Sequence, residues 1–261
     1  MAARGLRAAD RSWNLPIRSL LSMSGVFAAL AVWQALTMFF RLPAYVLPSP
    51  EALAQGLASN WSLLSTSLAS LLEQASLGFL VGNTTGIALA IAIDRMDSLR
   101  TVLVPFALLI RSVPIVAVTP LITLVAGFGV ITAVIVVALI SFFPAFVNIA
   151  VGLRSDSDMA DMLKSLGANR WHSLLKMQLP NSIPYLLSAA KISAPAAVLG
   201  AVIAEYLSTN SGLGYIIQNA DSNYHYDLVW EASSLATAVV LASVAVTSFA
   251  ERRLGRWSGS E

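Results

Sequence analysis

The sequence predicts an all-α protein that crosses a membrane about six times. Its 261 residues are 57% apolar and only 11% charged, whereas a soluble domain is roughly 25% charged. Apolar segments of about 20 residues, long enough to cross a bilayer as helices, recur along the chain. Nearly all Lys and Arg residues lie outside these segments and on one side of them, which is typical of polytopic membrane proteins.

Each expected span is an apolar run bounded by charged or turn-forming residues. The first ends at RLPAYVLPSPEAL, where prolines break a helix, and a short amphipathic helix over 51–59 follows. The second carries Gly78, Gly82 and Gly86 on one helical stripe, which permits close packing against another helix. GFG at 127–129 predicts a tight turn. The expected spans are 23–40, 71–93, 102–126, 130–153, 183–206 and 228–250.

The distribution of Lys and Arg predicts the orientation. With six spans, both termini and the loops after the second and fourth spans share one side, which carries every Lys and Arg outside the spans except Arg41. The positive-inside rule places that side in the cytoplasm. We therefore expect a cytoplasmic segment 1–22, a transmembrane domain 23–250 and a cytoplasmic tail 251–261. The first apolar block is long enough to be an uncleaved helix rather than a signal peptide.

Catalytic and metal-binding constellations are not evident in the sequence. Cysteine is absent, and the two histidines, His172 and His225, are far apart and are interpreted as surface residues. The phosphate-binding pattern G-x-x-x-x-G-K-[ST] does not occur, so we do not expect the chain to hydrolyse ATP by itself. The net charge of +2 is small and indicates no nucleic-acid partner.

One charged stretch, DMADMLKSLGANRWHSLLKMQLPNSIP at 158–184, interrupts the apolar sequence between the fourth and fifth spans. Asp158 can cap a helix that has Asp161 in its first turn, and Gly167 allows a left-handed turn. RWHSLLKMQ predicts a second helical piece, which Pro180 and Pro184 are expected to end. An apolar face at helical spacing in a cytoplasmic loop is expected to dock onto a partner; its members are Met159, Met162, Leu163 and Leu166.

The spacing Asp161-x5-Gly167-x9-Met177-x-Leu179-Pro180 resembles the signature loop of binding-protein-dependent ABC importer permeases. That family has Glu and two alanines before the glycine, and Ile-x-Leu-Pro after it. Asp161 therefore stands in place of Glu, Met162 and Leu163 in place of the alanines, and Met177 in place of Ile. Because the side chains at 162 and 163 are bulkier than alanine, we expect an ATPase partner dedicated to this permease.

Three further segments extend the resemblance over roughly residues 60–250: RSVPIVAVTPLITLVAGFG at 111–129, ISFFPAFVNIAVGL at 140–153 and IAEYLSTNSGLGYIIQNA at 203–220. They resemble the branch that imports sulfonate, taurine, nitrate, bicarbonate or pyrimidine precursors. Val125 and Ala126 stand where that branch often has Trp-Phe.

The resemblance implies a permease subunit in a bacterial inner membrane that works by alternating access. Implied partners are a second permease copy in a homodimer, two cytoplasmic ATPases that bind ATP and Mg²⁺, an external solute-binding protein and membrane lipid. No cofactor is expected in this chain. The loop 154–180 would couple the permease to the ATPase, with coupling helices within 158–176. Its candidate coupling residues are Asp158, Asp161, Met162, Leu163, Leu166, Gly167, Ala168, Arg170, Leu179 and Pro180.

A second group of candidate residues lies within or beside the spans and is assigned to the translocation pathway. Arg111 can attract an anionic solute, or lie near the cytoplasmic surface if Pro105 and Pro114 break the third span. Glu205 can gate the external mouth, or be a solvated carboxylate at a helix end. The pathway candidates, whose phenylalanines can alternatively pack against lipid or helices, are Arg111, Pro114, Phe142, Phe143, Asn148 and Glu205.

The predicted function is ATP-driven import of a small anionic solute. Two alternatives stay open. The same permease role for a heterocyclic vitamin or pyrimidine precursor is one. An ion-coupled secondary carrier is the other, although it is expected to show paired intramembrane carboxylates and an internal repeat, and neither is evident.

Overall fold

The computed structural model describes residues 14–40, 43–96, 105, 109, 112–154, 162, 167 and 169–254. Every regular element in these ranges is a helix, as the sequence predicts. The chain divides into two compact units, Met1–Asn60 and Trp61–Glu261. We therefore describe the two units separately.

The first unit contains helices α2 (Asn14–Phe40) and α3 (Pro50–Ser59). Helix α3 confirms the short helix expected over 51–59. The Oγ of Ser49 accepts a hydrogen bond from the Ala52 amide at 3.2 Å, and Pro50 occupies the first turn, where no N–H donor is needed. The indole N–H of Trp33 donates to the Pro48 carbonyl at 3.0 Å, which holds the connection against α2.

The second unit contains four helices that are long and apolar enough to cross a membrane: α4 (Trp61–Arg95), α7 (Val130–Gly152), α11 (Ile183–Ser208) and α13 (Tyr226–Leu254). They correspond to the second, fourth, fifth and sixth expected spans. Within the described residues, the first and third expected spans contain shorter apolar helical stretches: Phe27–Phe40, which is part of α2, and Ile115–Ala126. The count of six spans stays a prediction.

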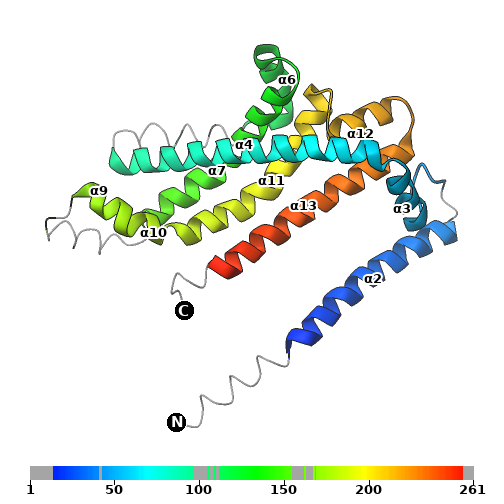
Figure 1. The fold of residues 1–261 in the computed structure, drawn as a ribbon, viewed down its shortest axis with the longest axis horizontal. Coiled ribbons are helices and arrows are strands. Elements are labelled where there is room, and N and C mark those ends of the chain that lie inside the picture. The colour runs from blue at the N-terminus through cyan, green and yellow to red at the C-terminus, as the bar shows by residue number, and fades with distance from the viewer. Residues whose placement is uncertain are drawn as a thin grey trace, which may run out of the picture. The chain divides into compact units, whose positions relative to one another are not determined.

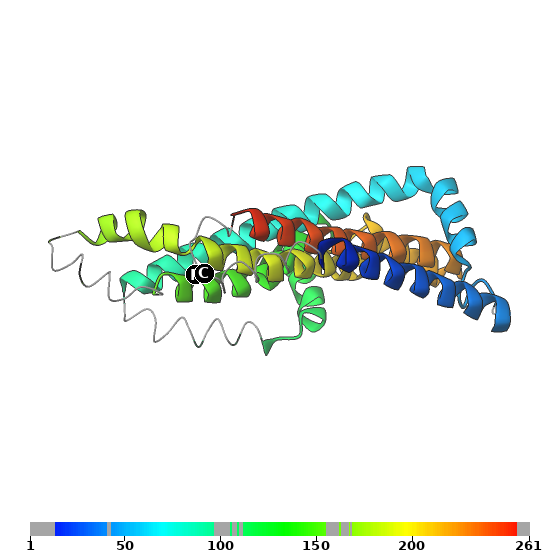
Figure 2. The same cartoon turned by 90° about the horizontal axis from the view of Figure 1, so that it is seen from below.

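Helix α4 packs most extensively against α7, and α11 lies between α7 and α13 (Figure 1 and Figure 2). The glycine stripe on α4 allows this contact. A Cβ added at Gly86 would lie 2.7 Å from the carbonyl oxygen of Phe142, and one added at Gly78 or Gly82 would clash with α7 as well. The stripe therefore serves helix packing within one subunit.

The third expected span is not one continuous helix. Helix α6 covers Ile115–Ala126 and begins after Pro114, whose backbone is extended. Proline removes an N–H donor and disfavours helical geometry at the residue before it, here Val113, which forms a bend. This break agrees with the alternative in which Pro114 interrupts the third expected span. Gly127 and Gly129, with φ of +82° and +120°, form the expected tight turn into α7.

Short helices pack at the two ends of this unit (Figure 1). At one end, α12 (Leu213–Ser222) packs against α4, α11 and α13. At the other, α9 (Arg170–Ser173), a π-helical turn η1 (Leu174–Gln178) and α10 (Leu179–Asn181) lead into α11. We call this second end the loop end. Its core cluster consists of Ala90, Ile93, Phe146, Ile149, Leu153 and Leu174.

Candidate functional site

The described part of the 154–180 loop is Arg154, Met162, Gly167 and the continuous run from Asn169. Gly167 has φ of +80°, the left-handed conformation expected at this position. Among the candidate coupling residues, Asp158, Asp161, Leu163, Leu166 and Ala168 lie outside the described residues. Arg111 also lies outside them. Arg170 begins α9.

The sequence predicted that Pro180 ends the second helical piece of the loop, but the structure shows that it does not. Helical structure continues through Pro180 to Asn181, and α11 begins at Ile183 with Pro184 in its first turn. Pro184 lies in the first turn of α11, where the missing N–H donor has no partner to lose, whereas Pro180 lies one residue before the continuous helical stretch ends at Asn181. The loop thus leads into α11 with only Ser182 between the two helices.

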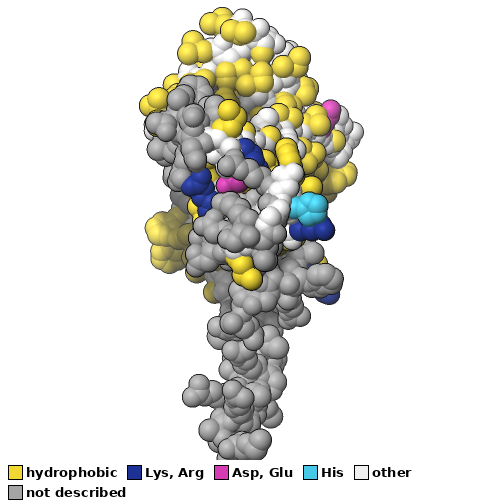
Figure 3. Space-filling view, turned by 90° about the vertical axis from the view of Figure 1, so that its left-hand side faces the viewer, with side chains coloured by type: hydrophobic (Ala, Val, Ile, Leu, Met, Phe, Trp, Pro, Cys, Tyr) yellow, Lys and Arg dark blue, Asp and Glu magenta, His cyan; other side chains and the backbone are white. Residues whose placement is uncertain are grey.

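Three large apolar side chains of the loop are exposed. Met162, Trp171 and Leu175 are 63%, 61% and 60% exposed. Figure 3 faces the loop end, where Lys, Arg and His side chains lie beside apolar ones. Because apolar surface in contact with water is costly, this combination is typical of a surface that binds another protein.

The opposite side of the same helical segment is anchored. Leu174 is only 2% exposed and belongs to the core cluster at the loop end, and Met177 is 8% exposed. The π-helical turn adds a residue within this stretch, and such turns often occur at functional sites. The segment therefore presents Trp171 and Leu175 outward while it is held to α4 and α7 from within.

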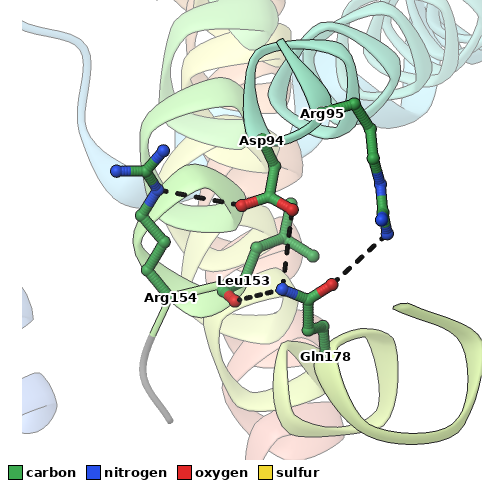
Figure 4. A network of polar contacts seen from close by, with 5 residues as sticks. All are labelled: Asp94, Arg95, Leu153, Arg154 and Gln178. Atoms are coloured by element: carbon green, nitrogen blue, oxygen red, sulfur yellow. Dashed lines mark hydrogen bonds and ion pairs between the residues drawn. The ribbon is translucent and has the colours of Figure 1, made fainter. Parts of the chain in front are cut away.

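A polar network joins this segment to the ends of α4 and α7 (Figure 4). The amide Nε2 of Gln178 donates to the Leu153 carbonyl at 3.2 Å and to Oδ2 of Asp94 at 3.5 Å. Its Oε1 accepts a hydrogen bond from Nη2 of Arg95 at 3.4 Å. On the other side of Asp94, Nε of Arg154 lies 3.8 Å from Oδ1.

Arg95 also contacts the exposed part of the loop. Its guanidinium carbon lies 5.4 Å from the ring centroid of Trp171, within the range of a cation–π interaction. Arg95 thus links Trp171, on the outer surface, to Gln178, in the network. The exposed Trp171 consequently has a defined orientation relative to α4.

A cavity of about 690 Å³ lies between α6, α7 and α11. Two pathway candidates, Phe143 and Asn148, line it, and its other described lining residues are apolar or Pro144. Asn148 Nδ2 donates to the Pro144 carbonyl at 2.8 Å. Pro114 lies between two lining residues, Val113 and Ile115, but does not itself line the cavity.

The two other described pathway candidates lie elsewhere. Phe142 stacks on Phe146 with ring centroids 5.7 Å apart, and thus packs against the core cluster. Glu205 is fully buried, so it is not the solvated carboxylate that one interpretation expected. Its Oε2 accepts a hydrogen bond from the Gly214 amide at 2.9 Å, in the first turn of α12. Its gating role stays a prediction.

Asp94, Leu153 and Gln178 were not identified by sequence reasoning. Gln178 occupies a variable position of the signature spacing, between Met177 and Leu179. Asp94 directly follows the second expected span and carried no assigned role. Their sequence separation of 84 residues leaves no local pattern that could connect them. Another pair far apart in sequence is Lys191 of α11 and Glu251 of α13, whose Nζ and Oε2 lie 2.7 Å apart.

Four long apolar helices define a polytopic helical membrane protein, and an anchored loop with exposed apolar side chains lies at one end of it. Residues 82–258 match the model of the family described as binding-protein-dependent transport system inner membrane component. The chain belongs to this family and is a permease subunit of an ABC importer. Membership of this family favours the ABC permease role over the alternative of an ion-coupled carrier.

Relatives that match most of the chain include two permeases that are 30% or more identical to it. The riboflavin transport system permease protein RibX of Chloroflexus aurantiacus is 31% identical over 237 residues, covering 88% of this chain and 87% of the relative. The aliphatic sulfonates transport permease protein SsuC of Bacillus subtilis, itself named as putative, is 30% identical over 237 residues, covering 88% of this chain and 85% of the relative. Both are permeases of comparable length.

The fold also resembles a solved structure. A chain of the MetNI methionine ABC transporter in an inward-facing conformation has a TM-score of 0.58 and 18% sequence identity. The match covers 76% of this chain and 95% of that chain. At this identity the likeness concerns the fold alone.

Proposed function

We propose that the 154–180 loop docks onto a separate cytoplasmic ATPase. ATP-driven closure of two such ATPases would displace the loop, which would rock the helices around the cavity and give alternating access. The observation that carries this proposal is the exposure of Trp171 and Leu175 on a segment whose other face, at Leu174, is buried in the helix core. A rigidly attached apolar surface can transmit a push to the helices.

The proposed assembly is a homodimer of this chain with two ATPases, an external solute-binding protein and surrounding bacterial inner-membrane lipid, with both termini in the cytoplasm. Its ATP and Mg²⁺ would be bound by the ATPases. The family description, a binding-protein-dependent transport system, supports the external partner. The absence of a phosphate-binding G-x-x-x-x-G-K-[ST] pattern in this chain supports a separate ATPase.

Co-purification and reconstitution test the proposal together. The tagged chain, extracted from its native membrane in mild detergent, should bring an ATPase chain with it. Liposomes that contain this complex and its binding protein should accumulate solute only when ATP is enclosed on the loop side. Uptake by this chain alone, driven by an ion gradient, would contradict the proposal.

For the solute we propose a small anion of the sulfonate, nitrate or bicarbonate type. The relative named for aliphatic sulfonates supports this class. A heterocyclic vitamin or pyrimidine precursor is the second candidate, favoured by the cavity, whose described lining is apolar apart from the amide of Asn148. Uptake assays with radiolabelled taurine and riboflavin, in the reconstituted complex, separate the two classes.

A further inference from the structure

Gln178 is the residue at which three parts of the second unit meet. Its side chain donates to the Leu153 carbonyl at the end of α7 and to Asp94 near the end of α4, and it accepts from Arg95. Its own backbone carbonyl accepts a hydrogen bond from Ser182 Oγ at 2.6 Å, just before α11 begins. Figure 4 shows the amide between the two helix ends.

These hydrogen bonds fix what the apolar contacts do not. Burial of Leu174 and Met177 holds the segment against the core, but hydrophobic contact is non-directional and permits sliding. Hydrogen bonds depend on distance and angle and therefore define one register between the loop and the helix ends. The bond to the Leu153 carbonyl is the shortest of the three, at 3.2 Å, and those to Arg95 and Asp94 involve charged groups at 3.4 and 3.5 Å.

The network lies close to the cavity along α7. Leu153 follows Asn148 by five residues, which is about 7.5 Å along a helix. Asn148, Val147 and Phe143 of α7 line the cavity. A displacement of the loop that is passed to Leu153 therefore reaches the cavity wall through less than two turns of one helix.

We propose that Gln178 is a positioning residue that makes the loop and the end of α7 move as one body, so that displacement at the ATPase surface changes the cavity. This inference rests on the proposed function. It goes further by naming the side chain through which the displacement passes, one that does not line the cavity.

The test measures the cavity directly and needs no identified solute. Because the chain has no cysteine, Val147→Cys and Ile192→Cys provide unique positions for spin labels on α7 and α11, at cavity residues that are 37% and 55% exposed. The labelled chain, in complex with its ATPase, is compared with and without Mg-ATP and vanadate. We expect the distance between the labels to change with ATP.

Adding Gln178→Leu to the labelled chain should reduce the ATP-responsive population about tenfold, since the bonds to the Leu153 carbonyl, Asp94 and Arg95 are lost together. ATP hydrolysis should continue, because the docking residues are intact. Gln218→Leu is the matched control, since the amide of Gln218 donates to Ser222 Oγ within the same helix, α12. It should leave the response unchanged.

A charge exchange separates positioning from mere stability. Gln178→Glu removes the donor to Leu153 and places a carboxylate against Asp94, so it should lose the ATP response. Adding Asp94→Asn restores a donor opposite residue 178 and should recover part of the response. If the Gln178→Leu chain fails to accumulate in the membrane, the comparison of Gln178→Glu with Gln178→Glu plus Asp94→Asn still tests the role of Gln178.

The outcomes distinguish the two proposals. If the labelled parent chain binds no ATPase, the proposed function fails and this inference fails with it. If the parent chain binds the ATPase and responds to ATP, and Gln178→Leu or Gln178→Glu responds equally, the proposed function stands and the role of Gln178 is refuted.

Discussion

Single residues determine how closely the helices of the second unit approach. Gly78, Gly82 and Gly86 leave no room for a side chain between α4 and α7, so the backbone of one helix touches the other. Interhelical packing of this kind is the main attraction between helices in a bilayer, where lipid chains are as apolar as the helix surfaces.

Gly86→Ala should destabilise the protein by about 1–3 kcal/mol, the usual cost of overpacking. Its added methyl group would lie 2.7 Å from the Phe142 carbonyl oxygen and 3.0 Å from the Ala145 Cβ, and so force α4 away from α7. Thermal unfolding in detergent measures the loss. Gly25→Ala in α2 is the control, because an added Cβ there meets nothing within 4 Å. Equal melting temperatures of the Gly86→Ala and Gly25→Ala variants would contradict this explanation.

Glu205 is a buried carboxylate of α11 that caps α12. Glu205→Ala should remove the acceptor of the Gly214 amide and cost about 1 kcal/mol, as other helix caps do. Glu205→Gln keeps an oxygen acceptor and should preserve most of the cap. Hydrogen exchange of the α12 amides checks both. Unchanged exchange in Glu205→Ala would show that the contact does not hold this helix.

Among the elements, the segment from α9 to α10 combines a buried and an exposed face. The π-helical turn η1 lies in the middle of this segment, and its residues Leu174 and Met177 are buried in the core. It continues through α10, and only Ser182 separates it from α11. The exposed apolar surface proposed to bind the ATPase is therefore attached to α11 as well as to α7.

Leu175→Asp should weaken the complex with the ATPase by about 2 kcal/mol or more, the usual effect of disrupting a central interface residue. The permease itself should keep its melting temperature, since Leu175 is 60% exposed. Tyr224→Asp is the matched control, because Tyr224 is 77% exposed and lies directly after α12, away from the loop end. Retention of the ATPase by Leu175→Asp would argue against docking on this surface.

At the scale of the whole molecule, the sequence predicts the helical architecture well because apolar length is a local property. Four expected spans became α4, α7, α11 and α13. Their ends were less predictable. Helix α4 begins at Trp61 rather than near Leu71, because its serine-rich first turns are helical without being strongly apolar.

Features that depend on distant contacts were not predictable. Pro114 was considered as a break, but its effect on the third span required the backbone to be seen. Gln178 bonds Asp94, and Glu205 accepts a hydrogen bond from the Gly214 amide. No periodic pattern in the sequence predicts either pair. The apolar loop surface was predicted, but its outward Trp171 and Leu175 were not among the expected residues.

The proposed orientation makes a prediction for the whole chain. A cysteine at Tyr224, after α12, should react with a membrane-impermeant thiol reagent in cells whose outer envelope is permeabilised. A cysteine at Lys176, on the loop, should react only after the inner membrane is opened, because the loop is expected in the cytoplasm. The chain has no other cysteine to react. The opposite labelling pattern would contradict the proposed orientation of the chain in the membrane.

Native mass spectrometry of the complex extracted from its own membrane tests the account most directly. It should find two copies of this chain with two copies of a nucleotide-binding ATPase, and Leu175→Asp should release the ATPases while the two permease copies stay together. Recovery of the unaltered chain without any ATPase, under conditions that preserve other membrane complexes, would contradict the central claim.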